Sequence, residues 1–336
     1  MKSAPAPLCT RLAAAFVAPV TACAVLLSGA LPAQAADFPS KPIKIVVPYA
    51  AGGSTDALAR MVAERLGQRL GQPAIVENKP CASEQIAITG VVKGPPDGHT
   101  ILLSTLSGLA VNPGLYGARL PYDPRKDLAP VLLAATVPSV VVVHPQVPVK
   151  SMAKLGAYLK GNPGKVSYAS AGNGTPSHLG MEYYKKANGY DPVHVPYKGG
   201  APALQELMGG QVQVMMALVP EAMPMVKDGR LRALALTSAK RLAAYPDVPT
   251  VAEDGGKDFD MTFWYAFMAP VGTPADVLAK LNSTIDAILQ DKDVRAKLAD
   301  MSLDVAGGPP ARVTELIRSD SAKWKKVIDE AGIKVD

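Results

Sequence analysis

The sequence predicts an α/β protein built as two lobes. Its 336 residues exceed what one hydrophobic core commonly serves. Short β-rich runs alternate with segments of helical spacing, a pattern that indicates right-handed βαβ units. This alternation restarts after residues 140–143. Two such series predict two lobes with a ligand site between them, because open α/β sheets bind ligands beyond the carboxyl ends of their strands.

The first series begins near the N-terminus of the predicted globular part. Apolar residues from Leu58 to Leu70 recur at helical spacing, and Gly71 closes that helix. The turn at 95–98 introduces a later strand. The β-rich runs expected as strands of this series are 43–49, 74–78 and 98–104.

The second series begins with the valine run 140–143. Ser151 is expected to cap a helix that extends to about residue 160, where 161–164 stop it. The strands expected after it are 166–170, 193–196, 212–216, 231–236 and a last long strand at 261–269. Two helical stretches, about 274–301 and 310–331, end the chain.

The restart at 140 and the late return strand predict where the chain passes between the lobes. We expect crossings near 137–143 and again between about 237 and 265. Lobe 1 would then hold about 37–138 plus 250–336, and lobe 2 would hold 139–249.

The first 35 residues have the features of a secretory signal peptide. Lys2 and Arg11 precede an apolar stretch at 12–31, and the small residues around Ala35 are typical of a cleavage site. Cleavage near Ala35 predicts a periplasmic protein. Two alternatives stay open: the apolar stretch is long enough for a membrane anchor, and Cys23 follows a lipobox-like sequence.

Composition excludes several classes of partner. The formal net charge is +6, no run of five basic residues occurs, and aromatics make up only 5% of the chain, so no nucleic-acid surface is predicted. Of the three cysteines, only Cys81 would remain after cleavage, which leaves no pair for an internal disulfide.

Enzyme motifs are missing. The chain has no G-x-S-x-G, H-E-x-x-H or P-loop sequence, and its four histidines do not pair at metal-ligand spacing. We therefore expect no catalysis, no metal and no cofactor. A hydrolase with Ser107 or Ser177 as nucleophile is kept as a remote alternative. His178 is interpreted either as a first-turn residue that fixes its loop or as a contact near a ligand.

Glycine, serine and threonine are concentrated in the loops that lead from strands into helices. Such loops expose backbone N–H groups at the positive end of the helix dipole, and glycine lets an anion approach them closely. The four loops are 51–55, 104–108, 170–175 and 198–200. They predict a site for a small anion, although Asp56 counts against a phosphate at the first loop.

An ordered chain of motifs resembles the Bug family, the periplasmic solute-binding receptors of tripartite tricarboxylate transporters. The resemblance covers residues 38–332. Its motifs are PSKPIKIVVPYAAGG at 39–53, VENKP at 76–80, PDGHT at 96–100, YASAGNGTPSH at 168–178, VPYKGGAP at 195–202, GGQV at 209–212, DVPTVAE at 247–253 and APVGTP at 269–274.

This resemblance implies a type II periplasmic-binding-protein fold, with a Rossmann-like, mostly parallel sheet in each lobe. It also implies a small carboxylate in the cleft, held by backbone amides and hydroxyls rather than by an arginine. The implied partners are integral membrane transporter subunits or, as the alternative, the ectodomain of a two-component sensor, and the receptor is expected to be a monomer. The residues expected at the ligand are Tyr49, Gly52, Gly53, Ser107, Ser170, Gly172, Asn173, Thr175 and Ala217.

The sequence departs from the family pattern in two places. A usual glycine-rich stretch is Cys81 to Gln85 here, which reduces backbone freedom. The usual Asp-Val-Met-Phe-Asp pattern is Gln213 to Ala217, so an acidic residue is absent at position 217. A ligand amine would thereby lose a counter-charge, and an amino acid ligand is disfavoured.

Overall fold

The computed structural model describes residues 38–80, 82–254, 259 and 261–335. The signal-peptide, anchor and lipoprotein predictions for 1–35 and the unpaired Cys81 lie outside these residues. Among the described residues, no helix combines the length and the apolar character needed to span a membrane.

One set of strands is built on the N-terminal part of the chain. The parallel strands β1, β2 and β3 form its edge, and β9 joins β3 in antiparallel orientation. The strand order is β2-β1-β3-β9-β4. These strands are β1 (Ile43–Val47), β2 (Ala74–Asn78), β3 (Thr100–Thr105), β9 (Thr262–Pro270) and β4 (Leu128–Val143).

A second set of strands starts from the other half of β4. There β7 and β8 pair with β4 in antiparallel orientation, and β5 lies parallel to both β6 and β7. A two-residue strand, β10 (Asp304–Val305), pairs in antiparallel orientation with the half of β4 that belongs to the first set. The remaining strands are β5 (Ser167–Ser170), β6 (Val193–Pro196), β7 (Val214–Leu218) and β8 (Arg232–Leu236).

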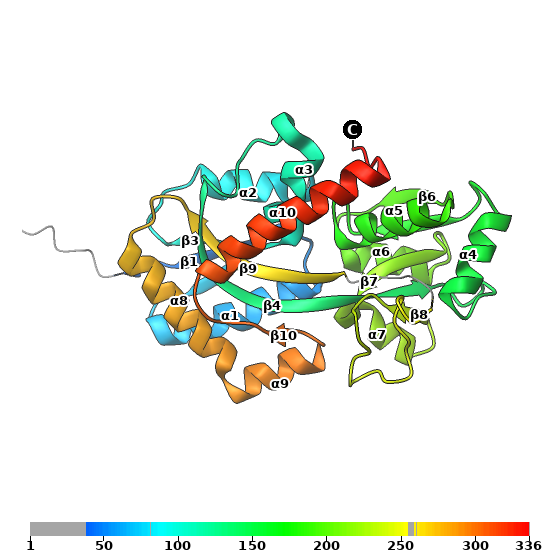
Figure 1. The fold of residues 1–336 in the computed structure, drawn as a ribbon. Coiled ribbons are helices and arrows are strands. Elements are labelled where there is room, and N and C mark those ends of the chain that lie inside the picture. Colours follow the sequence, from blue (N-terminus) through cyan, green and yellow to red (C-terminus); the bar gives the residue numbers. More distant parts are fainter. Residues whose placement is uncertain (1–37, 81, 255–258, 260, 336) are drawn as a thin grey trace, which may run out of the picture. The chain divides into compact units, whose positions relative to one another are not determined.

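The long strand β4 connects the two sets (Figure 1). It pairs with β9 up to Pro138, and from Ser139 onward it pairs with β7 and then β8. Proline offers no N–H to a strand neighbour, so Pro138 fits the point at which β4 changes partners. The chain returns toward β9 after Thr237, and hydrogen bonds hold Thr237 at the same point. Its hydroxyl donates to the Met261 carbonyl at 2.9 Å, and its N–H donates to the Ser139 carbonyl at 2.8 Å.

Helices cover both strand sets (Figure 1). Short helical turns also occur at Ala82–Glu84, Ser107–Val111 and Gly117–Arg119. The helices are α1 (Ser54–Leu70), α2 (Gln85–Val92), α3 (Asn112–Tyr116), α4 (Met152–Gly161), α5 (Pro176–Asn188), α6 (Gly200–Met208), α7 (Val219–Lys227), α8 (Ala275–Gln290), α9 (Lys292–Asp300) and α10 (Ala311–Ala331).

Most of the predicted elements are confirmed, and two were predicted wrongly in extent. Gly71 ends α1 in a left-handed conformation, and Ser151 caps α4 by accepting from the Lys154 N–H at 3.2 Å. The strand expected at 140–143 starts at residue 128. The helix expected at 274–301 is two helices, because Asp291 adopts an extended backbone between them.

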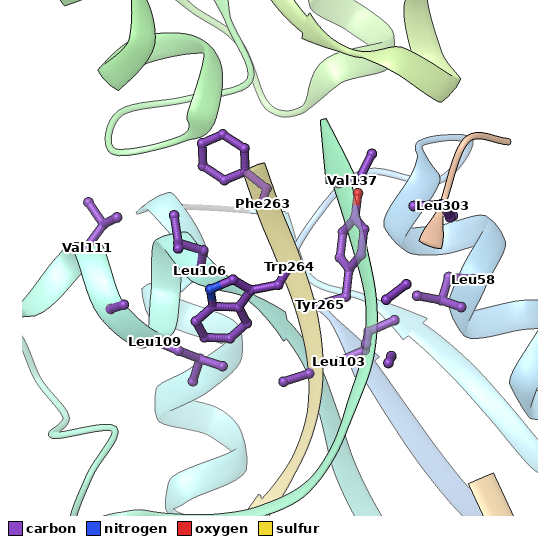
Figure 2. Packing of buried hydrophobic residues seen from close by; sticks show 14 of the residues in the cluster. Leu58, Leu103, Leu106, Leu109, Val111, Val137, Phe263, Trp264, Tyr265 and Leu303 are labelled. Atoms are coloured by element: carbon purple, nitrogen blue, oxygen red, sulfur yellow. The ribbon is translucent and has the colours of Figure 1, made fainter. Parts of the chain in front are cut away.

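The larger hydrophobic core packs around β9. Phe263, Trp264 and Tyr265 of β9 lie among buried leucines and valines (Figure 2). The Trp264 indole N–H donates to the Asp320 carboxylate of α10 at 2.7 Å, so even this core residue has its polar atom paired. A smaller core lies between β4, β7, α6 and α7.

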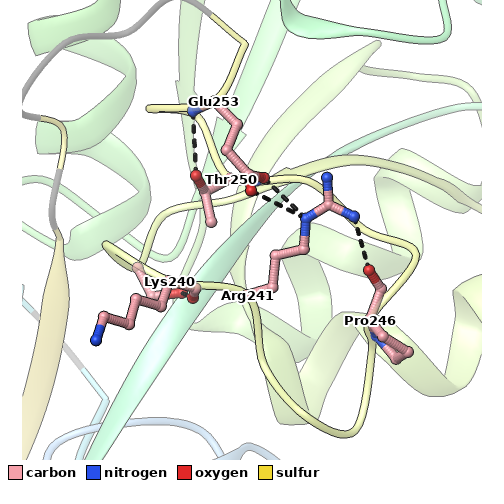
Figure 3. Close-up of polar contacts among 6 residues, drawn as sticks. Lys240, Arg241, Pro246, Thr250 and Glu253 are labelled. Atoms are coloured by element: carbon pink, nitrogen blue, oxygen red, sulfur yellow. Dashed lines mark hydrogen bonds and ion pairs between the residues drawn. The ribbon is translucent and has the colours of Figure 1, made fainter.

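Surface polar contacts hold the connection from β8 toward β9 (Figure 3). The Arg241 guanidinium pairs with the exposed Glu253 carboxylate at 2.9 Å and donates to the Pro246 carbonyl at 2.8 Å. The Thr250 N–H donates to Glu253, and the Glu253 N–H donates back to the Thr250 hydroxyl. This reciprocal pair shapes the loop without taking part in the cavity described next.

Candidate functional site

A cavity lies where the carboxyl ends of the two parallel strand sets face each other. Its empty volume, which includes space open to solvent, is about 600 Å³. Gly53 and Thr55 line it from the start of α1, and Thr175 and Ser177 line it from the start of α5. The rest of the lining is largely apolar or aromatic: Tyr49, Ala50, Ala171, Pro176, Ala201, Met215, Met216, Leu218, Phe263 and Tyr265, with Thr105, Gly199, Gly200 and Glu221.

A carboxylate of the chain itself meets the start of α1. Glu221, in the first turn of α7, accepts hydrogen bonds from the Ser54 N–H at 3.0 Å and the Ser54 hydroxyl at 2.9 Å. The Ser54 hydroxyl also lies 2.9 Å from that of Tyr265. Burial raises the pKa of the Glu221 carboxyl, and the two Ser54 donors offset this in part. Glu221 therefore lies at the positive end of the α1 dipole, whereas the N–H groups of Gly53, Thr55 and Asp56 have no hydrogen-bond partner among the described residues.

Asp56 takes up another donor of the same loop. Its carboxylate accepts from the Gly52 N–H at 3.1 Å, from Asn78 and from the Arg60 guanidinium. These hydrogen bonds keep the pKa of Asp56 below its ordinary value even though burial opposes them. In the loop 51–55, the N–H groups of Gly52 and Ser54 therefore donate to carboxylates of the chain itself.

A third internal carboxylate lies behind Tyr49. Glu84 is 1% exposed and accepts from the hydroxyls of Tyr49 at 2.6 Å and Ser104 at 2.5 Å, and from that of Thr105. The backbone N–H groups of Thr105 and Gly108 also donate to it, at 3.3 and 3.2 Å. Burial raises the pKa of Glu84, and this ring of donors opposes the rise. The polar groups of loop 104–108 therefore face Glu84.

The start of α5 is different, because no carboxylate occupies it among the described residues. Thr175 donates to the Gly172 carbonyl at 2.5 Å, and the Ser177 hydroxyl accepts from the Ala171 N–H at 2.9 Å. These bonds fold the loop back onto the helix. The backbone N–H groups of Ser177 and His178 have no hydrogen-bond partner in the described part of the chain. They are the unpaired donors that a helix N-terminus offers to an anion.

Two stacked histidines support this loop from behind. The His178 Nδ1 accepts from the Gly174 N–H at 3.1 Å, and His194 Nε2 lies 2.6 Å from the Ser170 hydroxyl. The two rings stack with centroids 4.3 Å apart. Burial lowers the pKa of His178 to about 4 and that of His194 to about 3. His178 thus fixes its loop, the first of its two predicted roles, and it is not among the residues that line the cavity.

The structure brings together only some of the residues expected at the ligand. Tyr49, Gly53 and Thr175 line the cavity, and Gly172 and Asn173 line an adjoining hollow that also includes Tyr49. The others do not line the cavity: Gly52, Ser107, Ser170 and Ala217. Ala217 packs in the smaller core and Ser107 is fully buried, whereas the neighbouring Met216 and Leu218 reach the cavity.

Sequence reasoning missed the two glutamates. Glu221 could have been found as an acidic residue directly after a predicted strand, where ligand sites of α/β sheets lie. Glu84 lies in a stretch singled out only for its lost glycines, and Ser83 and Glu84 indeed adopt positive φ angles of 52° and 74°. The cavity wall thus has an acidic side chain at position 221, although position 217 is an alanine. Among the described residues, no cluster of side chains has the composition of a metal site.

Comparison with protein families gives a match over most of the chain. The model of the TctC family, described as tripartite tricarboxylate transporter family receptors, matches residues 58–333. The BugT protein of Bordetella pertussis is 36% identical over 307 residues, which cover 91% of this chain and 94% of BugT.

Solved structures agree with this match. Rpa4515 of R. palustris, solved with adipate, superposes with a TM-score of 0.86 at 35% identity and covers 89% of this chain and 99% of its own. MatC of Rhodopseudomonas palustris, solved with malate, has a TM-score of 0.83 at 32% identity, covering 87% of this chain and 100% of its own.

Proposed function

Because the chain belongs to the TctC family of tripartite tricarboxylate transporter receptors, and so is a solute-binding protein, we propose that it captures a small carboxylate in the cavity between α1 and α5 and delivers it to membrane transporter subunits. The carrying observation is the start of α5, where Thr175 and Ser177 line the cavity and the Ser177 N–H has no hydrogen-bond partner among the described residues. The malate and adipate of its structural relatives support a carboxylate.

We place the ligand carboxylate at this end of the cavity. Two or three hydrogen bonds to a charged group contribute about 1.5–3 kcal/mol each, and contacts with the apolar lining would supply the rest of a roughly micromolar affinity after the cost of association. Tyr49, Gly53 and Thr175 are retained as ligand residues, and Gly172 and Asn173 border the entrance. The protein is proposed to act in the periplasm, as a monomer and without catalysis.

Closure of one lobe on the other would complete the site. We propose the boundaries expected from the sequence, with 37–138 plus 250–336 in one lobe and 139–249 in the other. The change of β4 partners at Pro138 and Ser139, and the contact of Thr237 with Met261, support a hinge there. With these boundaries, the hydrogen bonds between Ser54 and Glu221 connect the two proposed lobes.

Calorimetry on refolded protein tests the proposal. The panel contains monocarboxylates, dicarboxylates, tricarboxylates and amino acids, and unfolding with refolding first removes any ligand carried from the host. A ligand at 100 times its Kd is expected to add about 2.7 kcal/mol of stability. Absence of binding below roughly millimolar concentration for every carboxylate would contradict it. Loss of uptake of the best ligand in a strain that lacks the gene tests the transporter partner.

A further inference from the structure

Glu221 has one carboxylate oxygen that the protein does not use. Its Oε1 accepts both Ser54 donors, whereas Oε2 has no hydrogen-bond partner among the described residues. The side chain is partly buried and lines the cavity. One oxygen is thus fixed by the start of α1, and the other is left for whatever enters.

The backbone is built to let this carboxylate lie where it does. A Cβ at position 200 would come 1.8 Å from Glu221 Oε2, and one at position 53 would come 3.2 Å from Oε1. Glycines at both positions therefore leave room for the carboxylate between the starts of α1 and α6. Since Gly53 and Gly200 also line the cavity, Glu221 belongs to its wall.

The described lining of the cavity carries no positive side chain that would hold the Glu221 carboxyl group in its ionised form. The residues that line the cavity include no lysine, arginine or histidine, and Lys198 lines only the adjoining hollow. Burial raises the pKa of the Glu221 carboxyl, and only the two Ser54 hydrogen bonds oppose it. This raised pKa favours the neutral acid when no cation is near, whereas a ligand ammonium at Oε2 would favour the ionised form, which repels a second carboxylate.

We propose that Glu221 determines specificity by receiving the cationic end of the ligand, so that the receptor selects a small amino-carboxylate, with its carboxylate at the start of α5 and its ammonium at Glu221. This inference rests on the proposed function and narrows its ligand class. It also reverses the expectation drawn from Ala217, because the counter-charge for an amine is supplied from α7 instead of β7.

Glu84 strengthens the same selection. The donors of loop 104–108, which could have held a second ligand carboxylate, already hold Glu84. A dicarboxylate would therefore find donors at α5 only, and a like charge at the other end. Such a repulsive element is a common source of specificity.

Matched probe pairs test this selection. β-Alanine and succinate, γ-aminobutyrate and glutarate, and δ-aminovalerate and adipate share a chain length and differ only in ammonium against carboxylate. Their Kd values are measured by calorimetry for the refolded wild-type protein, for Glu221→Gln, and for Glu64→Gln, a control that makes the same change on the exposed face of α1.

For at least one pair, wild type and the Glu64→Gln control are expected to bind the amino acid at least tenfold more tightly than the dicarboxylate. Glu221→Gln should bring the two within about threefold, and Glu221→Lys should favour the dicarboxylate. A wild-type preference for dicarboxylates, or a ratio unchanged by Glu221→Gln, would overturn the inference and leave the carboxylate receptor standing. Failure of every carboxylate in the wider panel would remove both.

Discussion

The starts of α1 and α5 look alike in the sequence and differ in the structure. Both follow a strand through a loop rich in glycine, serine and threonine, and both line the same cavity. At α1 the chain supplies its own anions, because Asp56 holds the Gly52 N–H and Glu221 holds the Ser54 N–H. At α5 the N–H groups of Ser177 and His178 have no partner among the described residues. Internal carboxylates that hold donors of such a loop leave fewer donors for an external anion.

Among single substitutions, the largest effect is expected at Glu84, the third internal carboxylate. Glu84→Ala would leave three hydroxyls and two N–H groups of the 49 and 104–108 region without their shared acceptor, and should lower the free energy of unfolding by roughly 3 kcal/mol. Urea denaturation measures it.

Glu84→Gly is the matched control, because the backbone at 84 has φ 74°. Glycine should recover about 1 kcal/mol of the loss, since it adopts this conformation without steric cost. Equal stability of Glu84→Ala and wild type would show that the donors have other partners and that Glu84 is not needed as an internal anion.

The α5 loop is expected to respond to acid because two neutral histidines hold it. The pKa values of His178 and His194 are lowered from 6.5, so the unfolded chain binds protons that the folded chain does not. Stability is then fully present above pH 6.5 and is lost as pH falls toward 4, by roughly 3 kcal/mol for each histidine.

Denaturation at several pH values checks this expectation against His178→Asn/His194→Asn. Asparagine can still accept from the Gly174 N–H but does not titrate, so the variant should lose less stability over this interval. If the free energy of unfolding changes equally with pH in the two proteins, the histidines are not the cause of the acid response. Glu182 and Lys185, which also affect His194, would then be its source.

A smaller effect separates the two helix starts directly. Thr175 braces the α5 loop through the Gly172 carbonyl, so Thr175→Ala should weaken binding of the best carboxylate by about 1.5 kcal/mol, or roughly tenfold. Thr55→Ala, the cavity-lining threonine of α1, should change it less than threefold. The reverse order, measured by calorimetry, would move the ligand carboxylate to α1.

The smallest effect is expected far from the cavity. Arg241 and Glu253 form a solvent-exposed ion pair, so Arg241→Ala should leave both the free energy of unfolding and the ligand affinity nearly unchanged. Thermal and calorimetric measurements on this variant give the baseline for the others. A loss of affinity would instead show that the connection it braces takes part in closing the site.

The sequence alone predicted the α/β class, the order of nearly all strands and helices, and the family. Periodicity and turn residues are local properties, and for this reason Gly71 and Ser151 could be assigned as helix boundaries from the neighbouring residues. The start of β4 was harder to predict from the sequence, because Pro130 interrupts its apolar run. The strand accommodates this proline through a shift in its pairing with β9.

The state of the binding loops was decided only by the tertiary structure. Glu84 and Glu221 lie 20 to 24 and 167 residues away, respectively, from the donors that they meet at Ser104, Gly108 and Ser54. No local pattern encodes such a meeting. Whether a helix start is free for a ligand depends on which distant side chain the fold delivers to it, and that depends on packing across the whole chain.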